Sequence, residues 1–187
     1  LESRVADARA GIERIRSIVS ELLHVARRDG GEFGAVDLNH VVESVLPIVR
    51  HEARGRTRLT TDLGDVPTVE GDERLLGQIL LNLVLNAIQA IPEGESVDSH
   101  LVVVGTEAAL PNVRLVIRDT GVGIPDDVRD HVFEPFFSTK SPNEAVGLGL
   151  AVTRQLVERH RGTIDIESSP EGTRLVVELP ARSQEAP

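Results

Sequence analysis

The chain has 187 residues and a mass of 20.3 kDa, which suits one compact domain with a small appendage. Its composition, 40% hydrophobic and 27% charged, is that of a globular protein, and no apolar run reaches the ~18 residues that a membrane-spanning helix needs. A net charge of −10 argues against a general nucleic-acid-binding protein, and the lack of Cys excludes disulfides, thiolate metal sites and cysteine nucleophiles. The absence of Met, even at position 1, indicates a processed or excised fragment, without a signal peptide.

The first 28 residues are predicted to form one amphipathic helix with an apolar stripe. Apolar positions alternate three and four apart, as in a heptad seam, and further apolar residues make the stripe wider than that of a two-stranded zipper. A helical hairpin or bundle therefore fits better, and the exposed stripe favours a homodimer through residues 1–28. The alternatives are a helix folded back onto its own domain, or a monomer. The stripe consists of Val5, Ala8, Ile12, Ile15, Val19, Leu22 and Ala26.

Residues 29–36 are rich in Gly and charge and are predicted to be a linker to a second unit, residues 37–181, with a tail at 182–187. Asp37 and Asp72 are placed to cap helices. The expected elements are helices at 38–53, 73–91 and 148–160, an extended segment at 58–63, strands at 100–106 and 112–119, and a hairpin of strands at 163–168 and 173–179. This order predicts an α+β fold with helices on one face of a mixed sheet. The stretch 120–146 is too long for an ordinary connection and is therefore expected to be functional.

Two amide side chains occur in the predicted helix at 73–91. Asn82 and Asn86 are four residues apart, so both project from one helix face. Asn is a poor helix former and the neighbouring residues are apolar, which favours a functional pair over a core role. The alternative is a pair of buried amides that hydrogen-bond to backbone. An amide oxygen suits Mg²⁺, which takes its other ligands from water and phosphates.

Two glycine motifs follow the amide pair. Residues 119–125 (DTGVGIP) come directly after a strand. Glycines allow close approach to a flat ligand, and an acidic side chain at a strand end can accept a hydrogen bond from an exocyclic amine. Residues 147–150 (GLGL) open a helix, where free N–H groups and the helix dipole favour a phosphate. The alternatives are an ordinary turn and a glycine-rich helix start chosen for tight packing.

Taken in order, these elements resemble the boxes of two-component sensor histidine kinases. The boxes are the N box at 82–87, the G1 box at 119–125, the F box at 133–140, the G2 box at 147–150 and a last glycine motif at 171–173. The match covers about residues 36–180, and the helix at 1–28 resembles the second helix of the family's dimerisation hairpin. The resemblance implies a Bergerat (GHKL) fold, a two-layer α/β sandwich, with ATP and Mg²⁺ as cofactors.

The resemblance also implies residue roles. Asp119 receives the adenine amino group, Thr173 supports the base through water, and Asn86 holds Mg²⁺. Lys140 is the sole Lys among 20 basic residues and either places a charge near the phosphates or is a solvated loop residue. The implied catalytic residues are Asn82, Asn86 and Lys140. The implied ATP-binding residues are Asn82, Asn86, Asp119, Gly121, Gly123, Ile124, Lys140, Gly147, Leu148, Gly149, Leu150 and Thr173.

The chain departs from the family pattern at two places. The phosphoacceptor box is expected to be missing, since no first hairpin helix precedes Leu1; the nearest match, His51 before Glu52, lies near the end of a helix and lacks the expected Pro. The isolated chain is therefore expected to bind ATP without phosphorylating itself. Residues 144–146 (EAV) replace the usual Gly and small hydroxyl residue, so a γ-phosphate contact there must come from backbone N–H groups or from elsewhere.

The predicted function is the ATP-binding catalytic portion of a sensor histidine kinase, which transfers the γ-phosphoryl group of ATP to a His on a dimerisation hairpin. The expected partners are ATP or ADP, the acceptor hairpin of the same kinase and a response regulator, with no nucleic acid and no membrane segment. The expected location is the cytoplasm, and an upstream membrane anchor of the parent stays open.

Three other functions are alternatives for this sequence. An ATPase of the same superfold carries a Glu general base where this chain has Asn82, and a neutral amide cannot take a proton from water. A serine kinase that acts as an anti-sigma factor would lack the F box and the heptad helix. A non-catalytic nucleotide-binding or dimerisation module is kept open by the irregular lid and the missing acceptor.

Overall fold

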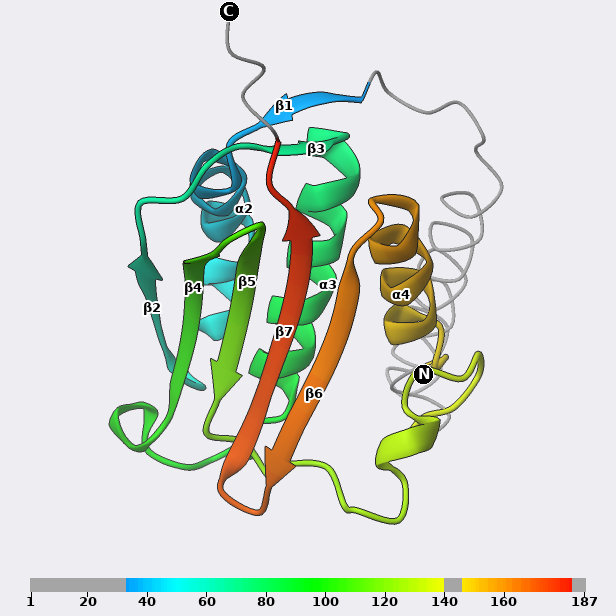
Figure 1. Cartoon of the computed structure of the whole chain (residues 1–187). Helices are drawn as coiled ribbons and strands as arrows, with labels where there is room; N and C mark the ends of the chain where they lie inside the picture. The colour runs from blue at the N-terminus through cyan, green and yellow to red at the C-terminus, as the bar shows by residue number, and fades with distance from the viewer. Residues whose placement is uncertain (1–32, 140–145, 183–187) are drawn as a thin grey trace, which may run out of the picture.

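Three helices cover one face of a five-stranded sheet, while the other face of the sheet is open (Figure 1). The computed structural model describes residues 33–139 and 146–182, so the predicted helix at 1–28 lies outside the described residues. The predicted α+β architecture, with helices on one face, is confirmed. No helix within these ranges is long and apolar enough to cross a membrane.

The sheet is mixed, as the sequence predicts. Its strands lie in the order β2 (Arg58–Leu63), β4 (Leu101–Ala109), β5 (Asn112–Asp119), β7 (Gly172–Pro180) and β6 (Thr163–Ser169). The outer strand β2 runs parallel to β4, and all other neighbours are antiparallel. The predicted strand at 100–106 extends to Ala109, because β4 continues to pair with β5 as far as Asn112.

The helices α2 (Leu38–Ala53), α3 (Glu73–Gln89) and α4 (Gly149–Arg159) form where they are expected. The carboxylate of Asp37 accepts hydrogen bonds from the backbone N–H groups at the start of α2. Asp72 does the same for α3, from the N–H groups of Arg74 at 3.0 Å and Leu75 at 3.3 Å. Both predicted caps are confirmed, and α3 ends at Gln89, two residues before the expected end.

Helix α3 is the centre of the core. It packs between α2 and α4 and against β4 and β5. Its residues Ile79, Leu80, Leu83 and Val84 have no exposed surface. Because a helix buried on this scale cannot shift without losing apolar contacts, its remaining face is held in a fixed position.

A short two-stranded ribbon at one end of the molecule was not predicted. Strand β1 (Gly34–Val36) pairs antiparallel with β3 (Val69–Gly71). The last three residues of the predicted linker at 29–36 are therefore part of this ribbon. A strand of three residues shows too little alternation for sequence reasoning to detect.

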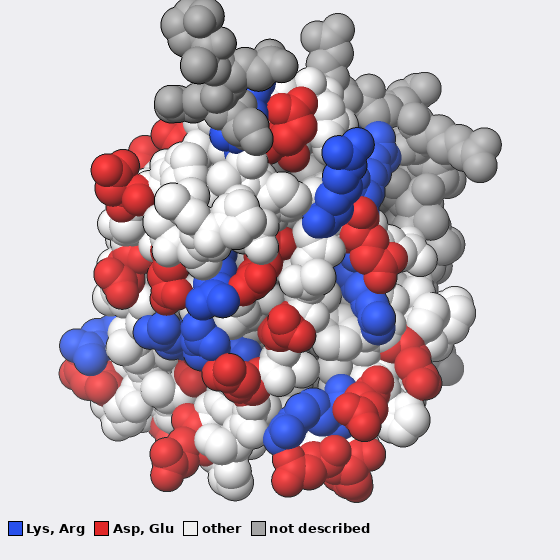
Figure 2. Space-filling model, in the orientation of Figure 1, with Lys and Arg blue, Asp and Glu red and all other residues white. Residues whose placement is uncertain are grey.

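The open face of the sheet is covered by charged side chains of both signs (Figure 2). Cross-strand ion pairs join Arg114 to Glu178 at 2.6 Å and Arg174 to Glu167 at 3.2 Å. Val116 points to this side of β5, yet it is buried. The stems of neighbouring long charged side chains thus keep water from Val116.

The cap of α3 yields a stability prediction. Replacing Asp72 by Ala removes the acceptor for two helix N–H groups, so Asp72→Ala is expected to lower the free energy of unfolding by about 1–2 kcal/mol. Asp65→Ala, at an exposed loop position, is expected to change it by less than about 0.5 kcal/mol. Urea titration measures both variants, and equal losses would contradict the capping role.

Candidate nucleotide-binding site

The carboxylate of Asp119 is buried at the carboxyl end of β5. Its Oδ1 accepts hydrogen bonds from the backbone N–H groups of Gly121, at 2.8 Å, and Thr173, at 3.3 Å. Burial raises the pKa of Asp119 above its ordinary value of 3.8, and these two hydrogen bonds offset part of the rise. Oδ2 has no hydrogen-bond partner among the described residues. One oxygen is therefore left to accept from a ligand.

The loop after β5 lies so close to neighbouring backbone that its glycines have no room for a side chain. A Cβ at Gly121 would lie 2.6 Å from the backbone oxygen of Ala90, at the end of α3. A Cβ at Gly123, whose φ is +68°, would overlap the backbone oxygen of Ser169. The N–H of Val122 donates to the oxygen of Ala90 at 3.1 Å. These contacts hold the loop between α3 and the β6–β7 turn.

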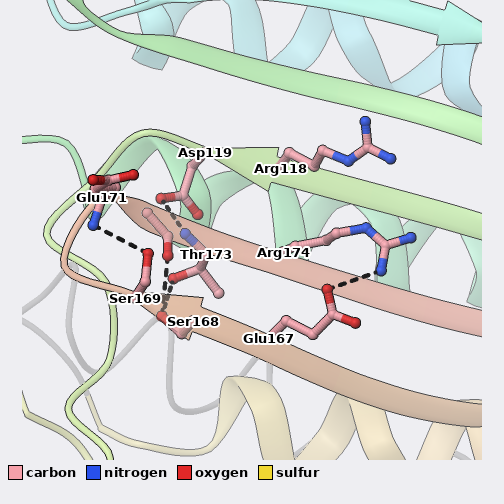
Figure 3. A pocket seen from close by; sticks show the side chains of 9 residues that line it. Arg118, Asp119, Glu167, Ser168, Ser169, Glu171, Thr173 and Arg174 are labelled. Carbon is pink, nitrogen blue, oxygen red and sulfur yellow. Dashed lines mark hydrogen bonds and ion pairs between the residues drawn. The ribbon is translucent and has the colours of Figure 1, made fainter.

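A second polar group, the hydroxyl of Thr173, lies beside Asp119 at the start of β7 (Figure 3). Its oxygen is 2.9 Å from the hydroxyl oxygen of Ser168, the residue opposite it on β6. Ser168 also accepts a hydrogen bond from the N–H of Ile124 at 2.8 Å. Sequence reasoning missed Ser168, because a lone Ser in a strand gives no spacing signal and its loop partner is 44 residues away.

The two amides of α3 lie on the same half-buried helix face, as their spacing predicts. The side-chain N–H of Asn82 donates to the hydroxyl of Thr153 on α4 at 2.7 Å. A Cβ at Gly149 would lie 2.7 Å from the side-chain oxygen of Asn82. Asn82 therefore joins α3 to the first turns of α4. The side chain of Asn86 has no hydrogen-bond partner in the described part of the chain.

The G2 box lies where α4 begins. Gly147 has a φ of +74°, and a Cβ there would overlap the backbone of Phe137. The side chain of Leu148 is buried and that of Leu150 packs against the core, so these two residues can offer a ligand only their backbone N–H groups. Such groups at a helix start suit an anion.

The phenylalanines of the F box differ in their burial. Phe133 packs against the core, whereas Phe136 is 72% exposed and adopts a φ of +68°. The N–H of Phe136 donates to the oxygen of Gly147 at 2.9 Å, which joins the F box to the G2 box. Lys140 lies outside the described residues, so its predicted role stays a prediction.

A shallow hollow of about 330 Å³ opens at the ends of β5, β7 and β6 (Figure 3). Neither Asn82 nor Asn86 lines this hollow. The hollow therefore overlaps the predicted site only at Asp119, and from there it continues onto the open face of the sheet. Its lining residues are Arg118, Asp119, Glu167, Ser168, Ser169, Glu171, Gly172, Thr173 and Arg174.

Within residues 33–139 and 146–182, no three His, Asp or Glu side chains gather in a way that could hold a metal ion. Asn86 offers one free amide oxygen, which suits Mg²⁺ when phosphates supply most of its ligands. The side chains therefore fit an ion that arrives with a nucleotide.

Comparisons with known proteins agree with this geometry. Residues 71–183 match the family described as "Histidine kinase-, DNA gyrase B-, and HSP90-like ATPase". The chain is 35% identical over 176 residues to the sensor histidine kinase ZraS of Klebsiella oxytoca. This alignment covers 92% of this chain and 37% of that protein. The chain spans about a third of the length of the curated relatives it matches.

Solved structures of histidine kinases share the fold, and two of them serve as examples. A mycobacterial sensor histidine kinase, MprB, aligns with a TM-score of 0.68 at 31% identity, over 82% of this chain and 100% of that one. Histidine kinase ThkA, in complex with response regulator protein TrrA, aligns with a TM-score of 0.74 at 25% identity, over 94% of this chain and 50% of that one.

A mixed sheet with helices on one face, and glycine loops beside a buried acidic residue, is the Bergerat fold of ATP-binding proteins. The chain belongs to the histidine kinase-, DNA gyrase B- and HSP90-like ATPase family. The relatives and solved structures named above are sensor histidine kinases, which agrees with the family predicted from the sequence.

The crowded loop after β5 yields a second prediction. Gly123→Ala adds the cost of a positive φ, about 1 kcal/mol, and an overlap with the backbone of Ser169 that adds about 1–3 kcal/mol. Gly55→Ala is the matched control, because Gly55 has a φ of +80° but open space around it. Chemical denaturation is expected to show the larger loss at Gly123, and equal losses would contradict the tight packing of the loop.

Proposed function

We propose that the chain binds Mg-ATP between the α3 face, the loop after β5 and the start of α4, and transfers the γ-phosphoryl group to a His on a dimerisation hairpin. The observation that carries this proposal is the buried carboxylate of Asp119, with one oxygen fixed by backbone N–H groups and the other free. An amine on a ligand that donates to the free oxygen adds the hydrogen bond that this oxygen lacks within the described residues.

At the base end, Asp119 accepts the exocyclic amine of adenine, and Gly121 and Gly123 let the loop backbone lie against the ring. Ile124 contributes through its backbone, whose N–H is held by Ser168. Thr173 supplies a hydroxyl beside the carboxylate. This arrangement supports recognition of a flat base through the edge that carries its exocyclic amine.

At the phosphate end, Asn86 supplies the amide oxygen that would hold Mg²⁺, which neutralises phosphate charge when it is bound. Asn82 keeps the start of α4 against α3, so that the backbone N–H groups of Gly147 and Gly149 can meet the phosphates. In phosphoryl transfer, positioning and charge neutralisation do most of the work.

Sustained ATP hydrolysis is disfavoured by the α3 side chains. The sole acidic residue of α3, Glu73, lies in its first turn, and the face that carries Asn82 and Asn86 has no carboxylate. A neutral amide cannot take a proton from water. The phosphoryl group is therefore expected to pass to a protein acceptor.

The partners follow from this transfer. The acceptor His lies on the hairpin of the parent kinase, and a response regulator receives the phosphoryl group next, which the complex of ThkA with TrrA supports. Use of ATP supports a cytoplasmic location for this part of the parent. Residues 1–28 would form the dimerisation helix.

The direct test of the proposal combines the chain with Mg-ATP and a separate hairpin that carries the acceptor His. The wild-type chain is expected to phosphorylate the hairpin in an acid-labile form. Asp119→Asn is expected to lower ATP affinity about tenfold to a hundredfold and to slow transfer at low ATP concentrations, because one acceptor of the amine becomes a donor.

Asp127→Asn is the matched control, since it makes the same change at an exposed position eight residues along the chain. Thermal unfolding without nucleotide completes the test, because Asn at position 119 removes a desolvated charge and is expected not to lower the stability. Unchanged ATP affinity in Asp119→Asn would contradict the proposal.

Acid is expected to weaken ATP binding. Burial raises the pKa of Asp119, so its carboxylate gains a proton at a higher pH than an exposed Asp does. ATP affinity is therefore expected to fall as the pH drops through this raised pKa. In the nucleotide-free protein the sign is opposite, because the stability that this group contributes is lost as the pH rises through the same pKa.

Calorimetric titration of ATP from neutral pH downward measures this effect. Asp119→Asn is the control, because its remaining affinity should lack this pH step. The same step in wild type and Asp119→Asn would assign the titration to another group.

A further inference from the structure

We propose that Ser168, which no box of the sequence includes, is a positioning residue that makes the base site specific for a 6-amino purine over a 6-oxo purine. This inference rests on the proposed binding of ATP. Ser168 is not proposed to touch the base itself, but to fix the direction in which the hydroxyl of Thr173 donates. That direction is set by the number of hydrogen bonds that the hydroxyl of Ser168 can make.

The hydroxyl of Ser168 has three neighbours at hydrogen-bond distance. These are the N–H of Ile124 at 2.8 Å, the backbone oxygen of Gly172 at 3.2 Å and the hydroxyl oxygen of Thr173 at 2.9 Å. A Ser hydroxyl has one proton to donate and two lone pairs that accept. Three contacts therefore use its whole capacity.

Two of these contacts have a fixed direction. The N–H of Ile124 can only donate, and the carbonyl of Gly172 can only accept. Ser168 therefore gives its single proton to Gly172 when all three bonds are made. Thr173 must then donate its own proton to Ser168. The hydroxyl of Thr173 is left with lone pairs alone for a ligand.

At the end of the site where the base would bind, the side chains of Asp119 and Thr173 then offer a ligand acceptors and no donor. The free oxygen of Asp119 accepts, and Thr173, whose N–H is bonded to the same carboxylate at 3.3 Å, accepts beside it. An amino group at position 6 of a purine donates and fits this pair. An oxo group in the same place has lone pairs only, so the pair repels it, and the N–H at position 1 of a 6-oxo purine reaches the pair only if the base shifts.

Ser168 is itself held in place by backbone. The backbone oxygen of Ser168 accepts a hydrogen bond from the side chain of Arg129 at 3.0 Å, and the Cα of Ser168 pairs with that of Thr173 across β6 and β7. The hydroxyl therefore stays opposite Thr173 without depending on a ligand. Without that hydroxyl, Thr173 is free to rotate and to donate a proton to an oxo group.

The test compares ATP with inosine triphosphate, which carries an oxo group at position 6. Affinities of the full chain for both are measured by competition against a fluorescent ATP analogue. Ser168→Ala is expected to lower the preference for ATP about fivefold, the worth of one ordinary hydrogen bond. Ser169→Ala is the matched control, because Ser169 is exposed and, among the residues that the structure describes, its hydroxyl bonds only to the N–H of Glu171.

A double-mutant cycle separates this role from a general structural effect. Thr173→Val is expected to lower the preference as Ser168→Ala does, and Ser168→Ala is expected to change it no further in the Thr173→Val background. Thr173→Ser keeps the hydroxyl and is expected to keep the preference. Ser168→Cys, which nearly preserves side-chain volume but bonds weakly, repeats the test if the Ala variant does not fold.

Three outcomes would overturn the inference while leaving ATP binding intact. They are an unchanged preference in Ser168→Ala, the same loss in Ser169→Ala, and a further loss in the Thr173→Val background. A wild-type chain that does not bind ATP would instead overturn the proposed function, so the two failures are distinguishable.

Discussion

A buried carboxylate oxygen joins the end of one strand to the start of another. Oδ1 of Asp119 accepts hydrogen bonds from two backbone N–H groups, that of Gly121 in the loop after β5 and that of Thr173 in β7. These bonds stabilise the ionised form, but the burial that raises its pKa outweighs them. The domain thus keeps an acidic side chain in an environment that disfavours its charged form, as functional sites commonly do.

The rest of the structure holds that carboxylate at a fixed distance from the amides of α3. The end of α3 accepts the N–H of Val122 through Ala90, which secures the loop after β5. Nearer the middle of the same helix, Asn82 bonds to Thr153 and secures α4. Because α3 is fully buried on its core side, one rigid helix sets the separation of the base end and the phosphate end.

The elements with local signals were predictable from the sequence. The caps Asp37 and Asp72 and the alternation of β5 depend on neighbours along the chain, and these expectations are confirmed. Ser168 and Thr153 were not found, because their bonds join residues 44 and 71 positions apart. A single hydroxyl gains its role from tertiary contacts, which no periodicity or spacing reveals. The ribbon of β1 and β3 was not predicted for the same reason, since only the pairing of two distant segments defines it.

The most direct test of this account is amide chemical-shift mapping of the chain during titration with Mg-ATP. The account predicts the largest shifts at Gly121, Gly123 and Thr173 and on the α3 face around Asn86, with smaller shifts on the open face of the sheet. Shifts confined to Arg118, Arg174 and the rest of the hollow on that open face would contradict it, because the nucleotide would then lie away from the amide pair.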